Sequence, residues 1–103
     1  MRLSTLSTEL VRVPVARDDA TDPTADVIWM AFVQGSGNPS SGDWIPASWE
    51  TVTISNVTTY YTAVLVGPQN GAKVLAAGEW RVWVKITDNP EIPVRYAGIL
   101  RVF

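Results

Sequence analysis

The sequence predicts an all-β fold, an immunoglobulin-like antiparallel β-sandwich with little or no helix. Short apolar segments alternate with the two-residue period of half-buried strands, and Gly, Pro, Asn and Ser separate them. No segment combines helical spacing with a capping residue over about ten positions. With 103 residues, of which 47% are hydrophobic, the chain is predicted to form a single domain over residues 1–103.

The first half of the chain contains two predicted strands. Residues 10–15 place three valines on one side, and Pro14 marks this segment as an edge strand because proline cannot donate to a ladder. Residues 27–33 are apolar on both faces. Their β-branched and aromatic content favours a central strand over a short buried helix. The Gly, Pro, Ser and Asn of residues 34–42 predict a loop.

The second half contains further predicted strands. Residues 49–54 and 60–66 form two of them, and the turn formers of residues 67–71 end the second. Trp80 opens the next strand after a glycine, at the place where an immunoglobulin-like domain carries the tyrosine of its tyrosine corner. A tryptophan at this place leaves the hydrogen bond of that motif open.

Residues 80–86 and 98–102 form a predicted C-terminal hairpin. Successive side chains of a strand alternate, so the even-numbered ones are expected in the core and the odd-numbered ones on the outer face. The register follows from pairing the apolar residues of the core face. We predict Val82 opposite Val102, and Val84 opposite Leu100.

Trp83 has two interpretations in this register. It packs beneath a loop or stacks on Arg101 as a cation-π pair, or it belongs to a protein-contact patch. Interfaces are enriched in Trp, Phe and Arg, and the outer face of the hairpin has this composition. The predicted protein-interface residues are Arg81, Trp83, Lys85, Ile99, Arg101, Phe103, Pro90 and Pro93.

Catalytic and metal chemistry has little support in the composition. The chain has no His and no Cys, which excludes the common serine triad, thiolate nucleophiles and imidazole metal ligands. The acidic residues within 18–26 lie in a polar loop that lacks the glycine and terminal glutamate of a calcium-binding EF-hand loop. We therefore predict no enzyme, no catalytic residue, no metal and no cofactor.

Two classes of partner are also disfavoured. The net charge of -2 is far from the basic excess that binding to a phosphate backbone requires, so we expect no nucleic-acid partner. The N-terminus has no apolar stretch resembling a signal-peptide core, and the longest apolar run, residues 27–33, is far shorter than the roughly 20 residues that span a bilayer. We expect a protein that is made in the cytosol, is not secreted and has no membrane partner.

Four aromatic residues outside the hairpin suggest an alternative function. Such rings form the platforms on which many β-sandwich modules stack sugars, although large aromatics more often pack in the cores of small domains. The predicted carbohydrate platform consists of Trp44, Trp49, Tyr60 and Tyr61.

Several segments, spread nearly from end to end, carry a resemblance to a known family. They are residues 7–15, residues 22–26, residues 42–50 with the later 66–68, and residues 75–102 with their 83–95 stretch. In these segments the chain resembles small proteins encoded among the virion structural genes of tailed phages that infect actinobacteria. The last segment is the most specific of them.

The resemblance implies a structural protein of the phage particle that decorates the head shell or sits at the head-to-tail junction. It implies phage capsid or other virion proteins as partners, many copies by symmetry, a location in the virion and no catalytic residues. A homo-oligomer and a position in the tail stay open. The alternative is a carbohydrate-binding module of a tail or adsorption device.

Overall fold

The computed structural model describes residues 1–15, 24–35, 37–87 and 92–103. These residues form an all-β fold, which confirms the predicted class, and they contain no helix that is long and apolar enough to cross a membrane. The described elements are β1 (Arg2–Leu3), β2 (Glu9–Val15), β3 (Val27–Gln34), the short 3-10 turn η1 (Ser41–Asp43), β4 (Trp44–Pro46), β5 (Ser48–Ile54), β6 (Val57–Val66), β7 (Gly78–Thr87) and β8 (Val94–Val102).

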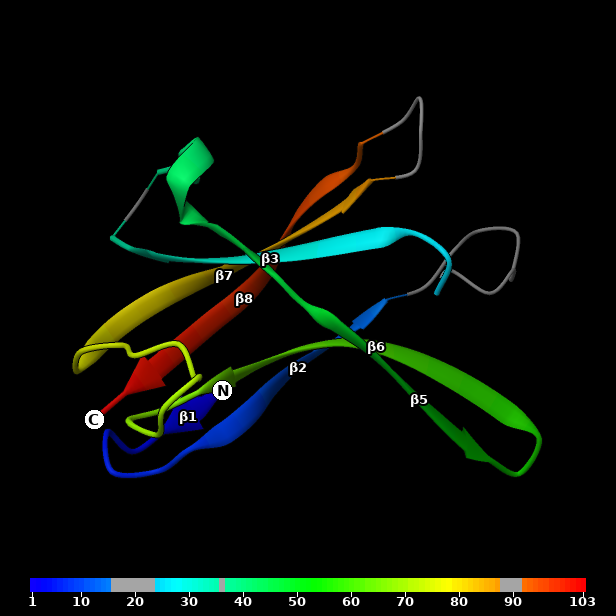
Figure 1. Cartoon of the computed structure of the whole chain (residues 1–103), viewed down its shortest axis with the longest axis horizontal. Coiled ribbons are helices and arrows are strands. Elements are labelled where there is room, and N and C mark those ends of the chain that lie inside the picture. Colours follow the sequence, from blue (N-terminus) through cyan, green and yellow to red (C-terminus); the bar gives the residue numbers. More distant parts are fainter. Residues whose placement is uncertain (16–23, 36, 88–91) are drawn as a thin grey trace.

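The strands form two sheets. The larger sheet has the order β1-β8-β7-β3-β4, and the smaller has the order β2-β6-β5. β1 runs parallel to β8, and the other paired strands are antiparallel. In Figure 1 the two sheets cross, and the turn of the β5–β6 hairpin lies at the lower right, away from the larger sheet.

One hydrophobic core joins the two sheets. It takes alternate side chains from the inner face of each strand, as the period of two requires. Val82 of the larger sheet and Val66 of the smaller are among its most buried members. The remaining core residues are Leu3, Val11, Ile28, Met30, Phe32, Val64, Leu75, Val84, Leu100 and Val102.

Two predictions about individual strands are confirmed. β2, which contains Pro14, lies at an edge of the smaller sheet. β3 lies between β7 and β4, with Met30 buried on the inner face and Ala31 buried on the outer one. Burial on both faces explains why this segment lacks polar alternation.

The predicted register of the C-terminal hairpin is wrong by four residues at Val82. Val82 lies opposite Gly98 and not Val102, and a β-bulge follows, so that Trp83 pairs with Tyr96. The predicted facing is nevertheless confirmed, since Val82 and Leu100 are buried. A shift by an even number of residues, here four, leaves each side chain on its own face, so the alternation is compatible with both registers.

Trp80, for which the sequence left the hydrogen bond of a tyrosine corner open, makes a hydrogen bond to the backbone. The indole Nε1 of Trp80 donates to the backbone oxygen of Ala76 at 2.9 Å. The ring also packs against the core. Trp80 therefore ties the start of β7 to the preceding segment.

Thr62 of β6 is fully buried, and its hydroxyl has no hydrogen-bond partner among the described residues. Burying an unpaired hydroxyl costs about 1–3 kcal/mol. We expect Thr62→Val to raise the free energy of unfolding by about 1 kcal/mol, measured by urea denaturation. Thr53→Val is the control because its hydroxyl lies 3.1 Å from that of Thr58 and is satisfied. A less stable Thr62→Val protein would contradict the prediction.

Candidate functional site

A row of large side chains crosses the outer face of the larger sheet. Ala31 of β3 lies opposite Trp44 of β4 on one side and Trp83 of β7 on the other. Trp83 in turn lies opposite Tyr96 of β8. Opposed residues of an antiparallel ladder share a face, so three rings from three strands form one row, with Ala31 between Trp44 and Trp83.

Lys85 lies beside this row, between two tryptophans. Its Nζ is 4.6 Å from the ring centroid of Trp44 and 5.5 Å from that of Trp29, which is its direct neighbour across the β3–β7 ladder. These distances are those of cation-π contacts. We call the surface formed by Trp29, Trp44, Arg81, Trp83, Lys85 and Tyr96 the outer aromatic face.

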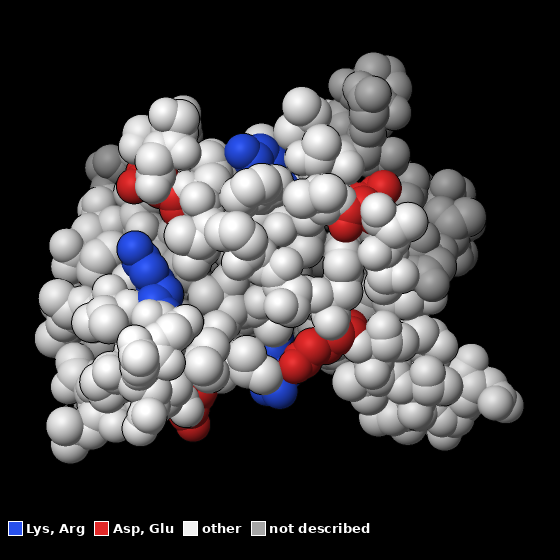
Figure 2. Space-filling model, viewed as in Figure 1, with Lys and Arg blue, Asp and Glu red and all other residues white. Residues whose placement is uncertain are grey.

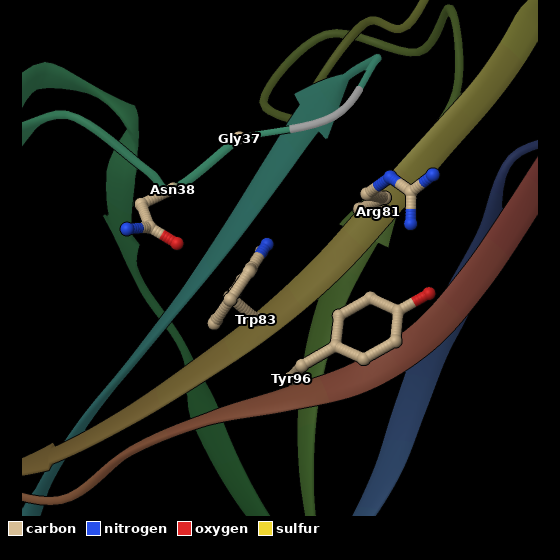
Figure 3. Close-up of a pocket in the computed structure, with 5 residues that line it drawn as sticks. All are labelled: Gly37, Asn38, Arg81, Trp83 and Tyr96. Atoms are coloured by element: carbon tan, nitrogen blue, oxygen red, sulfur yellow. The ribbon is translucent and has the colours of Figure 1, made fainter.

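A hollow of about 300 Å³ opens on the outer aromatic face. It is lined by Gly37, Asn38, Arg81, Trp83 and Tyr96. The rings of Trp83 and Tyr96 lie at its base with centroids 5.4 Å apart and planes tilted by 58°. Figure 3 shows the two rings side by side on neighbouring strands, with Gly37 and Asn38 on the side of the indole nitrogen. The hollow therefore combines apolar ring surface with amide and guanidinium groups.

The indole Nε1 of Trp83 is buried and has no hydrogen-bond partner among the described residues. A buried donor without a partner is costly, and most native proteins avoid it. Trp83 is therefore the residue of the outer aromatic face whose polar atom is buried without a partner among the described residues.

Two backbone anchors shape the rim of the site. Arg81 Nε donates to the backbone oxygen of Gly35 at 2.7 Å, which ties the loop after β3 to β7. The backbone N–H and the hydroxyl of Ser40 donate to Asp43 Oδ2 at 2.8 and 2.9 Å. The backbone hydrogen bond from Ser40 lowers the pKa of Asp43 below its ordinary value. This turn directly precedes Trp44 and positions its strand.

The predicted interface residues lie apart in two groups. Arg81, Trp83 and Lys85 of β7 belong to the outer aromatic face. Arg101 pairs with Glu79 through an ion pair of 3.0 Å, so the predicted stacking of Trp83 on Arg101 is wrong. The physical reason is the four-residue shift of register, which places Arg101 opposite Glu79 instead of Trp83.

The other predicted interface residues lie on β8 or next to its ends. Ile99 lies opposite Arg81, and Phe103 lies past the end of β8, where the guanidinium of Arg2 stacks on its ring at 5.1 Å. The backbone oxygen of Pro93 accepts a hydrogen bond from Ile86 at 3.1 Å. Pro90 lies outside the described residues.

The predicted carbohydrate platform does not form. Trp44 belongs to the larger sheet and Trp49 to the smaller, where its ring packs against the core and its Nε1 donates to the backbone oxygen of Asp26 at 2.9 Å. Tyr60 and Tyr61 are consecutive residues of β6 and therefore point to opposite faces. Only Trp44 of the four belongs to the outer aromatic face.

Sequence reasoning missed Trp29, Asn38 and Tyr96. Tyr96 was outside the predicted last strand, which begins four residues earlier than expected. Trp29 shares a face with Ala31 by simple alternation, but its proximity to Lys85 depends on the pairing of β3 with β7. No sequence signal marked Asn38, which lies in a loop.

The described residues contain no group of three or more His, Cys, Asp or Glu side chains that could hold a metal ion. Asp18, Asp19 and Asp22 of the polar loop lie outside the described residues. The fold and the site together define an all-β protein with an aromatic, cation-bearing surface. No protein-family model, curated protein or solved structure matches the chain.

Proposed function

We propose that the chain is a non-enzymatic structural protein of a phage virion that docks on the assembled capsid shell through the outer aromatic face. The observation that carries this proposal is the row of Trp44, Trp83 and Tyr96 on the outer face of the larger sheet, with Arg81 and Lys85 beside it. Trp, Tyr and Arg are the residues that dominate binding energy at protein interfaces. Here they lie on a sheet face outside the core.

The strand order supports an immunoglobulin-like assignment. The smaller sheet, β2-β6-β5, corresponds to strands B, E and D of that fold, and β8-β7-β3 corresponds to G, F and C. β4 then corresponds to C′, and β1 is a short first strand that runs parallel to G. In such a domain the outer face of the G-F-C sheet is free for contacts with other proteins.

The distribution of charge is compatible with a protein partner. On the side of the molecule that Figure 2 shows, the Lys and Arg side chains form isolated spots separated by uncharged surface. A phosphate backbone is bound by a continuous basic track. The absence of His and Cys from the sequence supports a role without catalysis.

A small domain is suited to a symmetric particle because the same contact is repeated at every equivalent position of the shell. Each copy contributes one modest interface, and the symmetry of the shell determines where the copies bind. The protein would be assembled from the host cytosol into the virion. Within this proposal the head shell is the first candidate site, and the head-to-tail junction and the tail are the alternatives.

Trp83→Ala tests the proposal. We expect the variant to bind shells of the encoding phage roughly 30-fold more weakly than the unsubstituted protein, because loss of a central interface residue costs about 2 kcal/mol. The measurement is co-sedimentation of purified protein with isolated empty shells over a range of concentrations. Parallel runs with purified tails distinguish the head from the tail position.

Tyr61→Ala is the matched control, because it removes a half-buried ring from the smaller sheet. We expect it to bind shells like the unsubstituted protein. Circular dichroism confirms that both variants are folded. Equal shell binding by folded Trp83→Ala and unsubstituted protein would refute the docking face.

A carbohydrate-binding module is the second candidate function. The hollow with its two tilted rings, Trp83 and Tyr96, and the amide of Asn38 favours it, because sugars stack on rings and bond to amides. Calorimetric titration with host cell-wall polysaccharide decides this case. Binding that is lost in Trp83→Ala and kept in Trp49→Phe would favour the module, and heats indistinguishable from dilution would eliminate it.

A further inference from the structure

The two sheets have four edge strands among the described residues, and three of these strands carry features that hinder pairing with another chain. β1 has two residues and β4 has three, ending in Pro46. β2 carries Pro14 within its ladder and Arg12 on its outer face. Short strands, prolines and charges are the devices by which proteins prevent an edge from pairing with another chain.

The fourth edge, β5, lacks these protections. It has seven residues without proline, and its single charged residue, Glu50, forms an ion pair with Arg12 across β6. Among the described residues β5 pairs with β6 alone. The side chains next to the β5–β6 turn are uncharged, and among them Ile54 is 69% and Val57 is 64% exposed.

The turn of the β5–β6 hairpin determines which backbone groups of β5 are free. Ser55 and Asn56 form a two-residue turn with φ of 52° and 66°, so Ile54 and Val57 are the hydrogen-bonded pair that closes it. Hydrogen-bonded and non-hydrogen-bonded pairs alternate along the ladder. The N–H and C=O groups of Trp49, Thr51 and Thr53 therefore point away from β6.

We propose that the β5 edge pairs with β5 of a second copy of this chain, antiparallel and with Thr51 opposite itself. This register places Trp49 opposite Thr53 of the second copy, so each free backbone group on the strand finds a partner. Glu50 then lies opposite Val52 of the second copy, and the two carboxylates avoid each other. The six strands of two smaller sheets become one continuous sheet.

A second copy is favoured over a foreign strand because β5 is complementary to itself. Thr51 lies at the centre of Ser48–Ile54, so the whole strand overlaps with its copy in a twofold arrangement. No like charges face each other in this arrangement. The pairing involves the smaller sheet and is independent of what the outer aromatic face binds.

Cysteine cross-linking tests the register. Because the chain has no Cys, the introduced residue is the only thiol in each variant. In the proposed dimer the two Thr51 Cα atoms are about 5.5 Å apart, which is within the range of a disulfide. The two Thr53 Cα atoms are more than about 10 Å apart. Under mild oxidation we expect Thr51→Cys to form a covalent dimer at least tenfold faster than Thr53→Cys.

Sedimentation provides a second readout. We expect the unsubstituted protein to dimerise reversibly as its concentration rises, and Thr51→Pro to stay monomeric because it removes an outward N–H that its own sheet does not use. A monomer at all concentrations for the unsubstituted protein would overturn the proposal. Equal rates of cross-linking at positions 51 and 53 would overturn it too, even where Thr51→Pro fails to fold.

Discussion

Gly67→Ala is expected to destabilise the protein by about 2–4 kcal/mol, a large part of the stability of a small domain. Gly67 has φ of +150°, which L side chains rarely adopt. An added Cβ would lie 2.5 Å from the Cα and Oγ1 of Thr8 and in contact with the backbone oxygen of Ser7. The Thr8 Cα and the Ser7 oxygen are backbone atoms, so relief of the clash requires the segment before β2 and the end of β6 to separate.

Substitutions at two other glycines distinguish the free-energy cost of the steric clash from the free-energy cost of a positive φ. Gly71 has φ of +89° and open space around a Cβ, so Gly71→Ala is expected to cost about 1 kcal/mol. Gly42 has neither feature, and Gly42→Ala is expected to be neutral within ~0.5 kcal/mol. Urea denaturation of the three variants measures the series. A Gly67→Ala protein no less stable than Gly71→Ala would contradict the clash.

Leu100→Ala is expected to lower the free energy of unfolding by about 3 kcal/mol and Tm by roughly 10–20 °C. Leu100 is 1% exposed and belongs to the core that both sheets share. The substitution removes apolar contact and leaves a cavity that two packed sheets cannot close. Differential scanning calorimetry measures the change.

Leu6→Ala makes the same chemical change at a site that is 88% exposed. We expect it to alter the free energy of unfolding by less than ~0.5 kcal/mol. The comparison isolates burial as the cause. Similar losses at Leu6 and Leu100 would show that residue 6 is covered in solution or that the core around residue 100 is loosely packed.

The strands were largely predictable because burial leaves a local signature. Residues 10–15 and 27–33 lie within β2 and β3, and Pro14 correctly indicated an edge. The inward facing of Val82 and Leu100 followed from alternation alone. In each case a one-residue error would expose an apolar face to water, so the sequence is strongly constrained.

The candidate site was only partly predictable. Trp83 was identified, but its neighbour is Tyr96 and not Arg101. A four-residue shift of register keeps the same side chains buried, and the bulge has no signal in the sequence pattern. Lys85 of β7 contacts the rings of Trp29 in β3 and Trp44 in β4. This contact depends on the pairing of strands that are far from β7 in the sequence. Likewise, Trp44 and Trp49 are five residues apart and lie in different sheets, because the chain crosses between the sheets at Ala47.

The sequence by itself therefore determined the all-β class, the inner and outer face of the main strands and the edge position of β2. These features depend on the periodic transfer of side chains out of water, which is a property of neighbouring residues. The tertiary structure decided which strands pair, which aromatic residues meet on the outer face and which edge is left without a partner. Those outcomes depend on contacts between strands far apart in the chain, and several pairings bury the same residues equally well.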